Sequence, residues 1–362
     1  MLESKGKISL RQAFFLFILI TFSPAIRLTP AFALDKAKQV AWLTPLPALI
    51  PCIIMIFVLN RVFKVYKDKS LMDAVYDIMG RWIGKVMVCI YFLWNVWLTA
   101  IYLRYDVERL VSSTYPNVDP NLFAIVTIAM VAYILPKGIT VIGRMSEILL
   151  PVTILTFVFL CLFLFPEVRI DSVIPVSTKD VMPIVHGSFV TTAIGSYMLT
   201  IFFMGEFIND KEKLFKSGIW YSIVYILLSI VLVFVTVGTL TSSVSKRLPI
   251  AFLVAVKQIS ILDTVEKIES LIVGTWIYAD FILLSVFSFV TLNMLKSLFN
   301  LRETKHLLNI FLVLIFFLSV GMAKNRFELS EFSDNFLVYI NSVFAIGFPV
   351  ILFVVGKIRK KI

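Results

Sequence analysis

One carboxylate in this sequence lies among residues that cannot solvate it. From Leu271 to Val286 the neighbours of Asp280 are apolar, aromatic or small. A carboxylate at such a depth is costly and marks a functional site by default. Asp280 can receive a ligand ammonium, hold a cation or take up a proton. A structural hydrogen bond to a hydroxyl or an unwound backbone is the alternative.

Two further pairs have the spacing of one helical face. Trp276 precedes Asp280 by four residues, so it either lines the same cavity or only packs beside it. Asn95 and Thr99 are also four residues apart and lie deep in another apolar run. We therefore take all four as candidate ligand contacts.

A charged cluster closes the run that holds Asn95 and Thr99. Arg104 and Glu108 stand at i and i+4 and are expected to pair, beside Asp106 and Arg109. Because the cluster lies near the predicted end of its helix, we interpret it as a solvated network at the outer rim.

The composition defines the medium around these residues. Of the 362 residues, 59% are hydrophobic and 16% charged, as in an all-α integral membrane protein. A transmembrane helix needs about 20 apolar residues. Ten apolar runs are predicted to span the membrane: 10–35, 39–62, 86–111, 121–136, 142–165, 183–208, 216–240, 268–296, 306–323 and 336–356.

The basic residues predict the orientation of these spans. With the N-terminus inside, most of the 34 lysines and arginines fall in alternate, cytoplasmic links. Both termini are then cytoplasmic. Topology and anionic membrane lipid explain the net charge of +11, so no nucleic acid partner is expected.

Ten helices divide into two sets of five with opposite orientation, as in a 5+5 inverted repeat. We expect a single transmembrane domain over 1–362, with repeats at about 10–165 and 183–356. In such folds the first helix of each repeat is broken at the midplane, where a ligand binds. Residues that favour breaks in helices 1 and 6 are Thr21, Ser23 and Pro24, and Thr192, Gly195, Ser196 and Tyr197.

Two alternatives stay open at these positions. Proline and glycine are common in membrane helices, so each break is either a simple kink or part of a ligand cavity. Arg27 follows the first break and is expected to extend toward the outer surface, with a secondary role in holding a carboxylate. Between helices 7 and 8, the apolar stretch 250–261 is either a lid on the outer surface or a packing element.

Enzymatic chemistry has little support. The sequence has no glycine-rich phosphate loop and no cluster of Cys or His, and the three cysteines lie in separate apolar runs. We expect no enzyme activity, cofactor, metal site or disulfide framework.

An ordered series of motifs resembles one family along nearly the whole chain. It comprises KISLRQ, VAWLTPLPA, YLRYDVERLVSSTYPNVDP, GRMSEILLP, INDKEKLFKS and VEKIESLIVGTWIYADFILLSVF. The series resembles the B subunit of bacterial spore germinant receptors, a family similar to the amino acid/polyamine/organocation transporters. Members often carry an acidic residue beside glycine at the helix 6 break, where this chain has IGSY.

The resemblance implies a leucine-transporter-like fold and a nutrient sensor in the spore inner membrane. It also implies a germinant such as an amino acid, a membrane A subunit and a lipoprotein C subunit. We expect the germinant between helices 1, 3, 6 and 8. The alternatives are a proton- or sodium-coupled amino acid transporter, and a scaffold subunit with a vestigial cavity.

Overall fold

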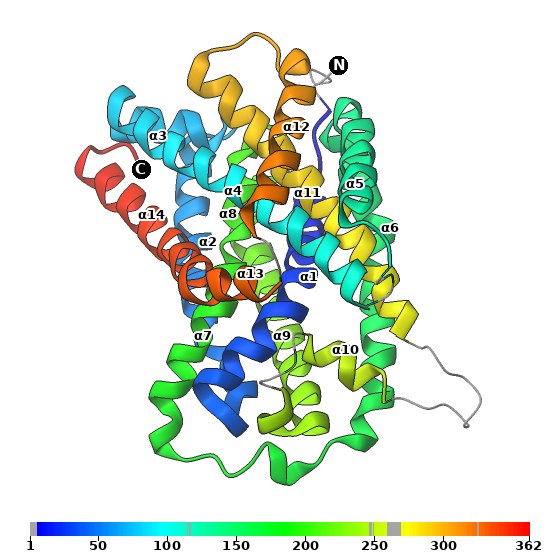
Figure 1. Ribbon diagram of the computed structural model, residues 1–362. Coiled ribbons are helices and arrows are strands. Elements are labelled where there is room, and N and C mark those ends of the chain that lie inside the picture. The colour runs from blue at the N-terminus through cyan, green and yellow to red at the C-terminus, as the bar shows by residue number, and fades with distance from the viewer. Residues whose placement is uncertain are drawn as a thin grey trace.

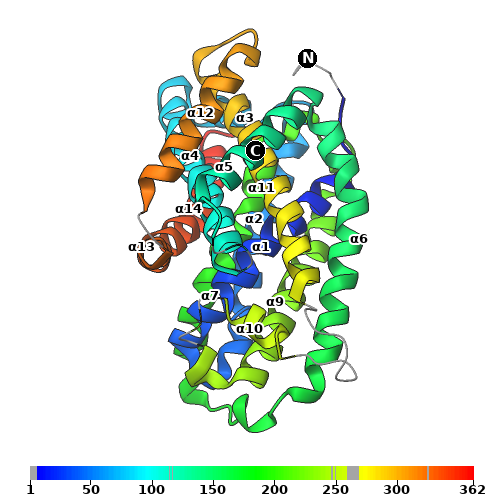
Figure 2. The same cartoon turned by 45° about the vertical axis from the view of Figure 1, so that its right-hand side comes forward.

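Ten spans cross the molecule. The computed structural model (Figures 1 and 2) describes residues 6–113, 115, 117–245, 248, 250–258, 269–323 and 326–362. Within these ranges ten helices are long and apolar enough to cross a membrane, which confirms the predicted number. The spans are Leu10–Leu43, Leu46–Val65, Arg81–Ser113, Pro120–Lys137, Ile139–Glu167, Thr178–Phe203, Lys211–Leu240, Ser270–Phe299, Lys305–Met322 and Glu328–Ile358.

The regular structure of the described residues is almost wholly helical. The spanning helices are α1 (Leu10–Ala37), α2 (Leu49–Val65), α4 (Arg81–Ser113), α5 (Pro120–Ile134), α6 (Ile139–Leu164), α7 (Val181–Gly195), α8 (Tyr197–Phe203), α9 (Leu214–Ser245), α11 (Glu269–Phe299), α12 (Lys305–Met322) and α14 (Val338–Ile358). Shorter helices are α3 (Leu71–Met79), α10 (Ala251–Val256) and α13 (Arg326–Phe332). Both termini lie toward one end of the molecule, called the terminal side below, and α10 lies toward the other, the far side (Figure 1).

The first helix is the centre of the bundle. In α1, 94% of the most apolar window is buried, whereas the windows of α5 and α12 are 22% and 28% buried. A helix that is apolar on every side is stable only when surrounded, and α1 contacts α6, α7, α9 and α11. Its start is fixed by a capping box, in which Ser9 Oγ accepts from Gln12 N and Gln12 Oε1 accepts from Ser9 N.

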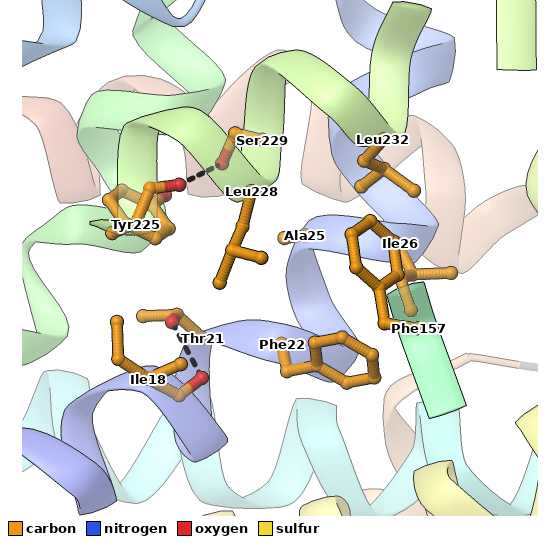
Figure 3. A pocket seen from close by; sticks show the side chains of 10 residues that line it. All are labelled: Ile18, Thr21, Phe22, Ala25, Ile26, Phe157, Tyr225, Leu228, Ser229 and Leu232. Carbon is orange, nitrogen blue, oxygen red and sulfur yellow. Dashed lines mark hydrogen bonds between the residues drawn. The ribbon is translucent and has the colours of Figure 1, made fainter. Parts of the chain in front are cut away.

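The predicted interruption of helix 1 is wrong in this structure. Residues 10–37 form one helix that contains Pro24 and Pro30. Pro24 has no N–H, so it leaves the Ile20 carbonyl without its helical partner and bends a helix without ending it. Packing on all sides holds the bent helix together, and the α1 ribbon changes direction between Thr21 and Ala25 (Figure 3).

The predicted interruption of helix 6 is present only as one turn residue, Ser196, whose φ and ψ stay in the right-handed helical region. α7 ends at Gly195, Ser196 forms a turn, and α8 begins at Tyr197. Ser196 Oγ donates to the Ala193 carbonyl at 2.6 Å, so the side chain competes with the helical ladder at the break. A Cβ on Gly195 would lie 3.2 Å from Cys52 Sγ, so glycine allows α2 to approach closely here.

The predicted lid is present only in part. Within the described residues of 250–261, α10 is a six-residue helix whose Phe252 is fully buried. It packs on α1, α6, α9 and α11, so it covers the central helix on the far side. Residues 259–261 lie outside the described ranges.

Candidate functional site

Four side chains from three helices form a buried ion network around Arg109. Arg109 Nη2 donates to Asp280 Oδ2 on α11 and, at 3.2 Å, to Asp106 Oδ1 on its own helix α4. Arg109 Nη1 donates to Ser23 Oγ of α1 at 2.7 Å. None of the four is more than 3% exposed. The network therefore ties the bend of α1 to α4 and α11.

The charges of this network do not balance. Two carboxylates face one guanidinium, and the Thr127 hydroxyl donates to Asp106 Oδ2 at 3.2 Å. Buried charges are stable when they are paired, so a second carboxylate on one arginine favours an added proton or cation. An ammonium group is one such cation.

Trp276 covers one face of the network. The guanidinium carbon of Arg109 lies 4.6 Å from the centre of the Trp276 ring, close enough for a cation–π contact. Trp276 Nε1 and Arg109 Nε are buried and have no hydrogen-bond partner among the described residues. Two donors beside the carboxylates are thus left for an acceptor.

A second buried arginine lies one turn beyond Ser23. Arg27 is 8% exposed, and its guanidinium carbon lies 3.3 Å from the ring centre of Tyr105 and 5.4 Å from that of Tyr102. Its Nε and Nη2 have no hydrogen-bond partner within the described part of the chain. The expected extension toward the surface is therefore wrong, since two tyrosine rings from α4 enclose the side chain.

A chain of hydrogen bonds holds the break in helix 6. The Tyr197 hydroxyl shares a hydrogen bond with the Tyr102 hydroxyl and accepts from Asn341 Nδ2 at 3.3 Å. Asn341 Oδ1 accepts from Trp94 Nε1 at 2.7 Å. The first residue of α8 is thereby joined to α4 and α14.

The remaining predicted residues are satisfied by the protein itself. Asn95 Nδ2 donates to Thr291 Oγ1 at 2.8 Å, and Thr99 Oγ1 donates to the Asn95 carbonyl at 2.7 Å. Thr192 and Gly195 are buried in the last turns of α7. Asn95 thus joins α4 to α11, whereas Thr99 bonds within α4, and both lie on the α4 face that carries the ion network.

Thr21 lines an apolar pocket apart from the ions. The pocket lies between α1, α6 and α9 and is small, with a cavity volume of about 20 Å³ (Figure 3). Its hydroxyls are satisfied locally, since Thr21 Oγ1 donates to Phe17 and Ile18 carbonyls and Ser229 Oγ donates to the Tyr225 carbonyl. The described residues that line it include no charged side chain.

The sequence predicts Asp280, Ser23 and Trp276 as ligand contacts, but it does not predict that Asp106 and Arg109 are their buried partners. Asp106 and Arg109 are buried at 3% exposure, so the solvated rim network predicted for them is wrong. The pairing of Arg104 with Glu108 is confirmed, at 2.7 Å. A signal was available, because positions 95, 99, 102, 106 and 109 carry polar or charged side chains at steps of three and four, which is one helical face.

Comparison with protein families decides the affiliation of the chain. A family model described as "Spore germination protein" matches residues 7–327. The chain belongs to the spore germination protein family. Its relatives include spore germination protein KB of Bacillus subtilis (strain 168), 22% identical, with 99% of this chain and 96% of that protein covered. Spore germination protein A2 of the same organism is 22% identical over 86% of this chain and 84% of that protein.

Solved structures with the same fold are transporters. MhsT in complex with L-phenylalanine superposes with a TM-score of 0.63 at 12% identity, covering 94% of this chain and 89% of that one. Mhp1, a nucleobase-cation-symport-1 family transporter, gives 0.59 at 15% identity, covering 96% and 78%. The predicted leucine-transporter-like fold is confirmed. Family and fold are those of a permease-like or receptor membrane protein rather than of a known enzyme family.

Proposed function

We propose that this spore germination protein is the nutrient-sensing membrane subunit of a germinant receptor and binds a small germinant, an amino acid, beside its buried ion network. The observation that supports this most directly is the pair of carboxylates on Arg109, at the point where α1, α4 and α11 meet. Two negative charges and one positive charge favour an additional cation, and a ligand ammonium supplies it.

The carboxylate of the amino acid needs a separate partner. α1 has no gap between half-helices, so it offers no free half-helix N-terminus of the kind used in inverted-repeat transporters. Arg27 instead offers two buried N–H donors that have no partner among the residues the structure describes. A guanidinium binds a carboxylate through two parallel hydrogen bonds, which makes Arg27 the partner we assign.

Binding at this place acts on the shape of the bundle. An ammonium that binds Asp106 or Asp280 competes with Arg109 for that carboxylate. The competition weakens the hydrogen bond from Arg109 to Ser23, which attaches α1 to α4. A ligand shifts such an equilibrium only by its differential affinity for the two arrangements. The membrane A subunit and the lipoprotein C subunit, in the spore inner membrane, would respond to the shift.

A proton-coupled amino acid transporter is the second candidate. The same surplus carboxylate supports it, because a proton can take the place of the ligand ammonium between transport steps. Uptake of labelled amino acid into proteoliposomes by the isolated chain, driven by a pH gradient, separates transport from sensing.

The test of sensing is Asp280→Asn in spores that carry the complete receptor. Germination in response to amino acids is expected to be lost while the receptor still assembles, because Arg109 keeps Asp106 as partner. Asp171→Asn, an exposed carboxylate on the far side, is the matched control and should respond normally. A normal response of the Asp280 variant would overturn the binding role and favour the scaffold.

A further inference from the structure

The indole N–H of Trp276 is buried without a hydrogen-bond partner. Trp276 is 1% exposed, and its Nε1 has no partner among the described residues. Two half-buried indoles do have partners. Trp42 Nε1 donates to the Val173 carbonyl at 3.1 Å, and Trp94 Nε1 donates to a side-chain oxygen at 2.7 Å. Because a buried indole N–H usually finds an acceptor, the more deeply buried Trp276 lacks one that a ligand can supply.

A second donor of this kind lies on Arg109. Its guanidinium carbon is 4.6 Å from the centre of the Trp276 ring, and its Nε has no partner within the described part of the chain. The other two nitrogens of the guanidinium are bonded to Ser23, Asp106 and Asp280. The two unpaired donors thus belong to side chains in contact. A donor that is buried without a partner is unfavourable, and an oxygen acceptor removes that cost.

The charged groups of an amino acid are assigned to other partners. In the proposed function, on which this inference rests, the ammonium lies at Asp106 or Asp280 and the carboxylate lies on Arg27. The unpaired atoms of Arg27, Nε and Nη2, share one edge of the guanidinium and suit the two oxygens of one carboxylate. The acceptor for Trp276 and Arg109 then comes from the side chain of the ligand.

The charges of the site favour a neutral side chain on the ligand. Asp106 and Asp280 carry two negative charges, and Arg27 and Arg109 carry two positive charges. All four side chains are buried, and their charges sum to zero. An amino acid with a neutral side chain is a zwitterion and preserves this balance. An acidic or basic side chain would add a buried charge without a counter-ion, which is costly.

We propose that the germinant is an amino acid whose neutral side chain carries an oxygen acceptor, an amide or a hydroxyl, and that Trp276 selects it. Asparagine, glutamine, serine and threonine have such side chains. Their oxygen accepts from Trp276 Nε1 or Arg109 Nε, whereas an aliphatic side chain of the same shape leaves both donors buried and unpaired. A site built to hydrogen-bond a polar group discriminates strongly against an analogue that lacks it.

The test compares ligands of equal shape on the purified full chain in detergent. Asparagine and leucine form one pair, threonine and valine form another, and thermal-shift titration gives a dissociation constant for each. In at least one pair we expect the polar member to bind about tenfold more tightly, as one buried hydrogen bond provides. Aspartate, which has the shape of asparagine and an added charge, should bind more weakly than asparagine. Aliphatic ligands that bind as tightly as the polar ones in both pairs, or aspartate that binds more tightly than asparagine, would overturn the proposal.

The variant Trp276→Phe removes the indole N–H and keeps an aromatic ring beside Arg109. The preference for the polar ligand should fall several-fold in this variant. Because the preference is a ratio of two affinities, a general loss of stability does not change it. Trp97→Phe makes the same substitution at a 43% exposed position on α4 and is the matched control, which should keep the preference. An unchanged preference in Trp276→Phe would show that Trp276 does not select the side chain.

The same titrations distinguish the side chain of the germinant from the germinant site itself. If no amino acid raises the melting temperature of the wild type, the binding role fails and the proposal fails with it. If aliphatic amino acids raise it as much as polar ones do, the germinant site stands and only the assignment of the side chain is wrong. Asp280→Asn should weaken the binding of polar and aliphatic amino acids alike, because it removes a partner of the ammonium that they share.

Discussion

At the scale of single residues, replacing the buried arginine should destabilise the protein more than replacing either buried carboxylate. Arg109 is the cation that both Asp106 and Asp280 share. Loss of one partner of a buried pair leaves an uncompensated charge and costs about 3–5 kcal/mol. Replacement of the arginine isolates two carboxylates, whereas replacement of one carboxylate leaves a balanced pair.

We therefore predict that Arg109→Gln lowers the thermal stability of the purified protein far more than Asp280→Asn does. The expected loss for Arg109→Gln is about 3 kcal/mol or more, and Asp280→Asn should cost less than about 1 kcal/mol. The double variant should be more stable than Arg109→Gln alone, because it buries one carboxylate fewer. Thermal unfolding in detergent measures the order, and equal losses in both single variants would contradict the unequal roles.

Replacing Arg27, unlike replacing Arg109, should not lower the thermal stability of the protein. Its Nε and Nη2 have no hydrogen-bond partner among the described residues, so its charge is stabilised mainly by the rings of Tyr102 and Tyr105. A buried charge without good partners contributes little to stability. We expect Arg27→Met to keep or raise the melting temperature and to abolish the stabilisation that a bound amino acid provides. A thermal-shift titration checks both, and an unchanged ligand shift would exclude Arg27 as the carboxylate partner.

At the scale of helices, the bend of α1 is a property of Pro24 and of what packs around it. We predict that Pro24→Ala restores the hydrogen bond to the Ile20 carbonyl and straightens α1. Straightening moves Ser23 away from Arg109, so the response to germinant should fall while stability is kept or raised. Pro151→Ala makes the same change on the exposed face of α6 and is the control. A normal germination response in the Pro24 variant would show that the bend is incidental.

The break between α7 and α8 depends on side chains from other helices. Tyr197→Phe removes one hydroxyl and leaves Tyr102 and Asn341 each short of a partner. A buried polar group without a partner costs about 1–3 kcal/mol, and we expect a loss of stability in that range. Tyr278→Phe, which removes a bond to Thr153 at 2.9 Å, is the control away from the break. A smaller loss of stability for Tyr197→Phe than for Tyr278→Phe would contradict a special role for the hydrogen bonds at the break.

Helices and their breaks differ in how far the sequence alone predicts them. Each span needs its own length of apolar residues, so all ten were predictable from one stretch of chain at a time. Whether a proline ends a helix or bends it depends on the packing around it, and α1 is buried on every side. Asp280 was predictable because its neighbours are apolar. The polar face of α4 that carries Arg109 was predictable from its spacing, but the burial of Arg109 was not, because that burial depends on where α1 and α11 lie beside α4.

At the scale of the whole molecule, basic residues are expected to distinguish the two sides. Both termini lie on the terminal side, together with the link between α8 and α9, which carries Lys211 and Lys213, and with Lys216 in the first turn of α9 (Figure 1). The positive-inside rule places this side in the cytoplasm.

This orientation can be measured by labelling single cysteines in a chain whose native cysteines are replaced. Cys52 and Cys161 are buried and Cys89 is exposed on a membrane span, so none of them reports on an aqueous side. We predict that an impermeant maleimide reaches Lys179→Cys in intact cells, and Glu212→Cys only after permeabilisation. Both positions are exposed, so access depends on the side of the membrane alone. The reverse pattern would put the termini outside.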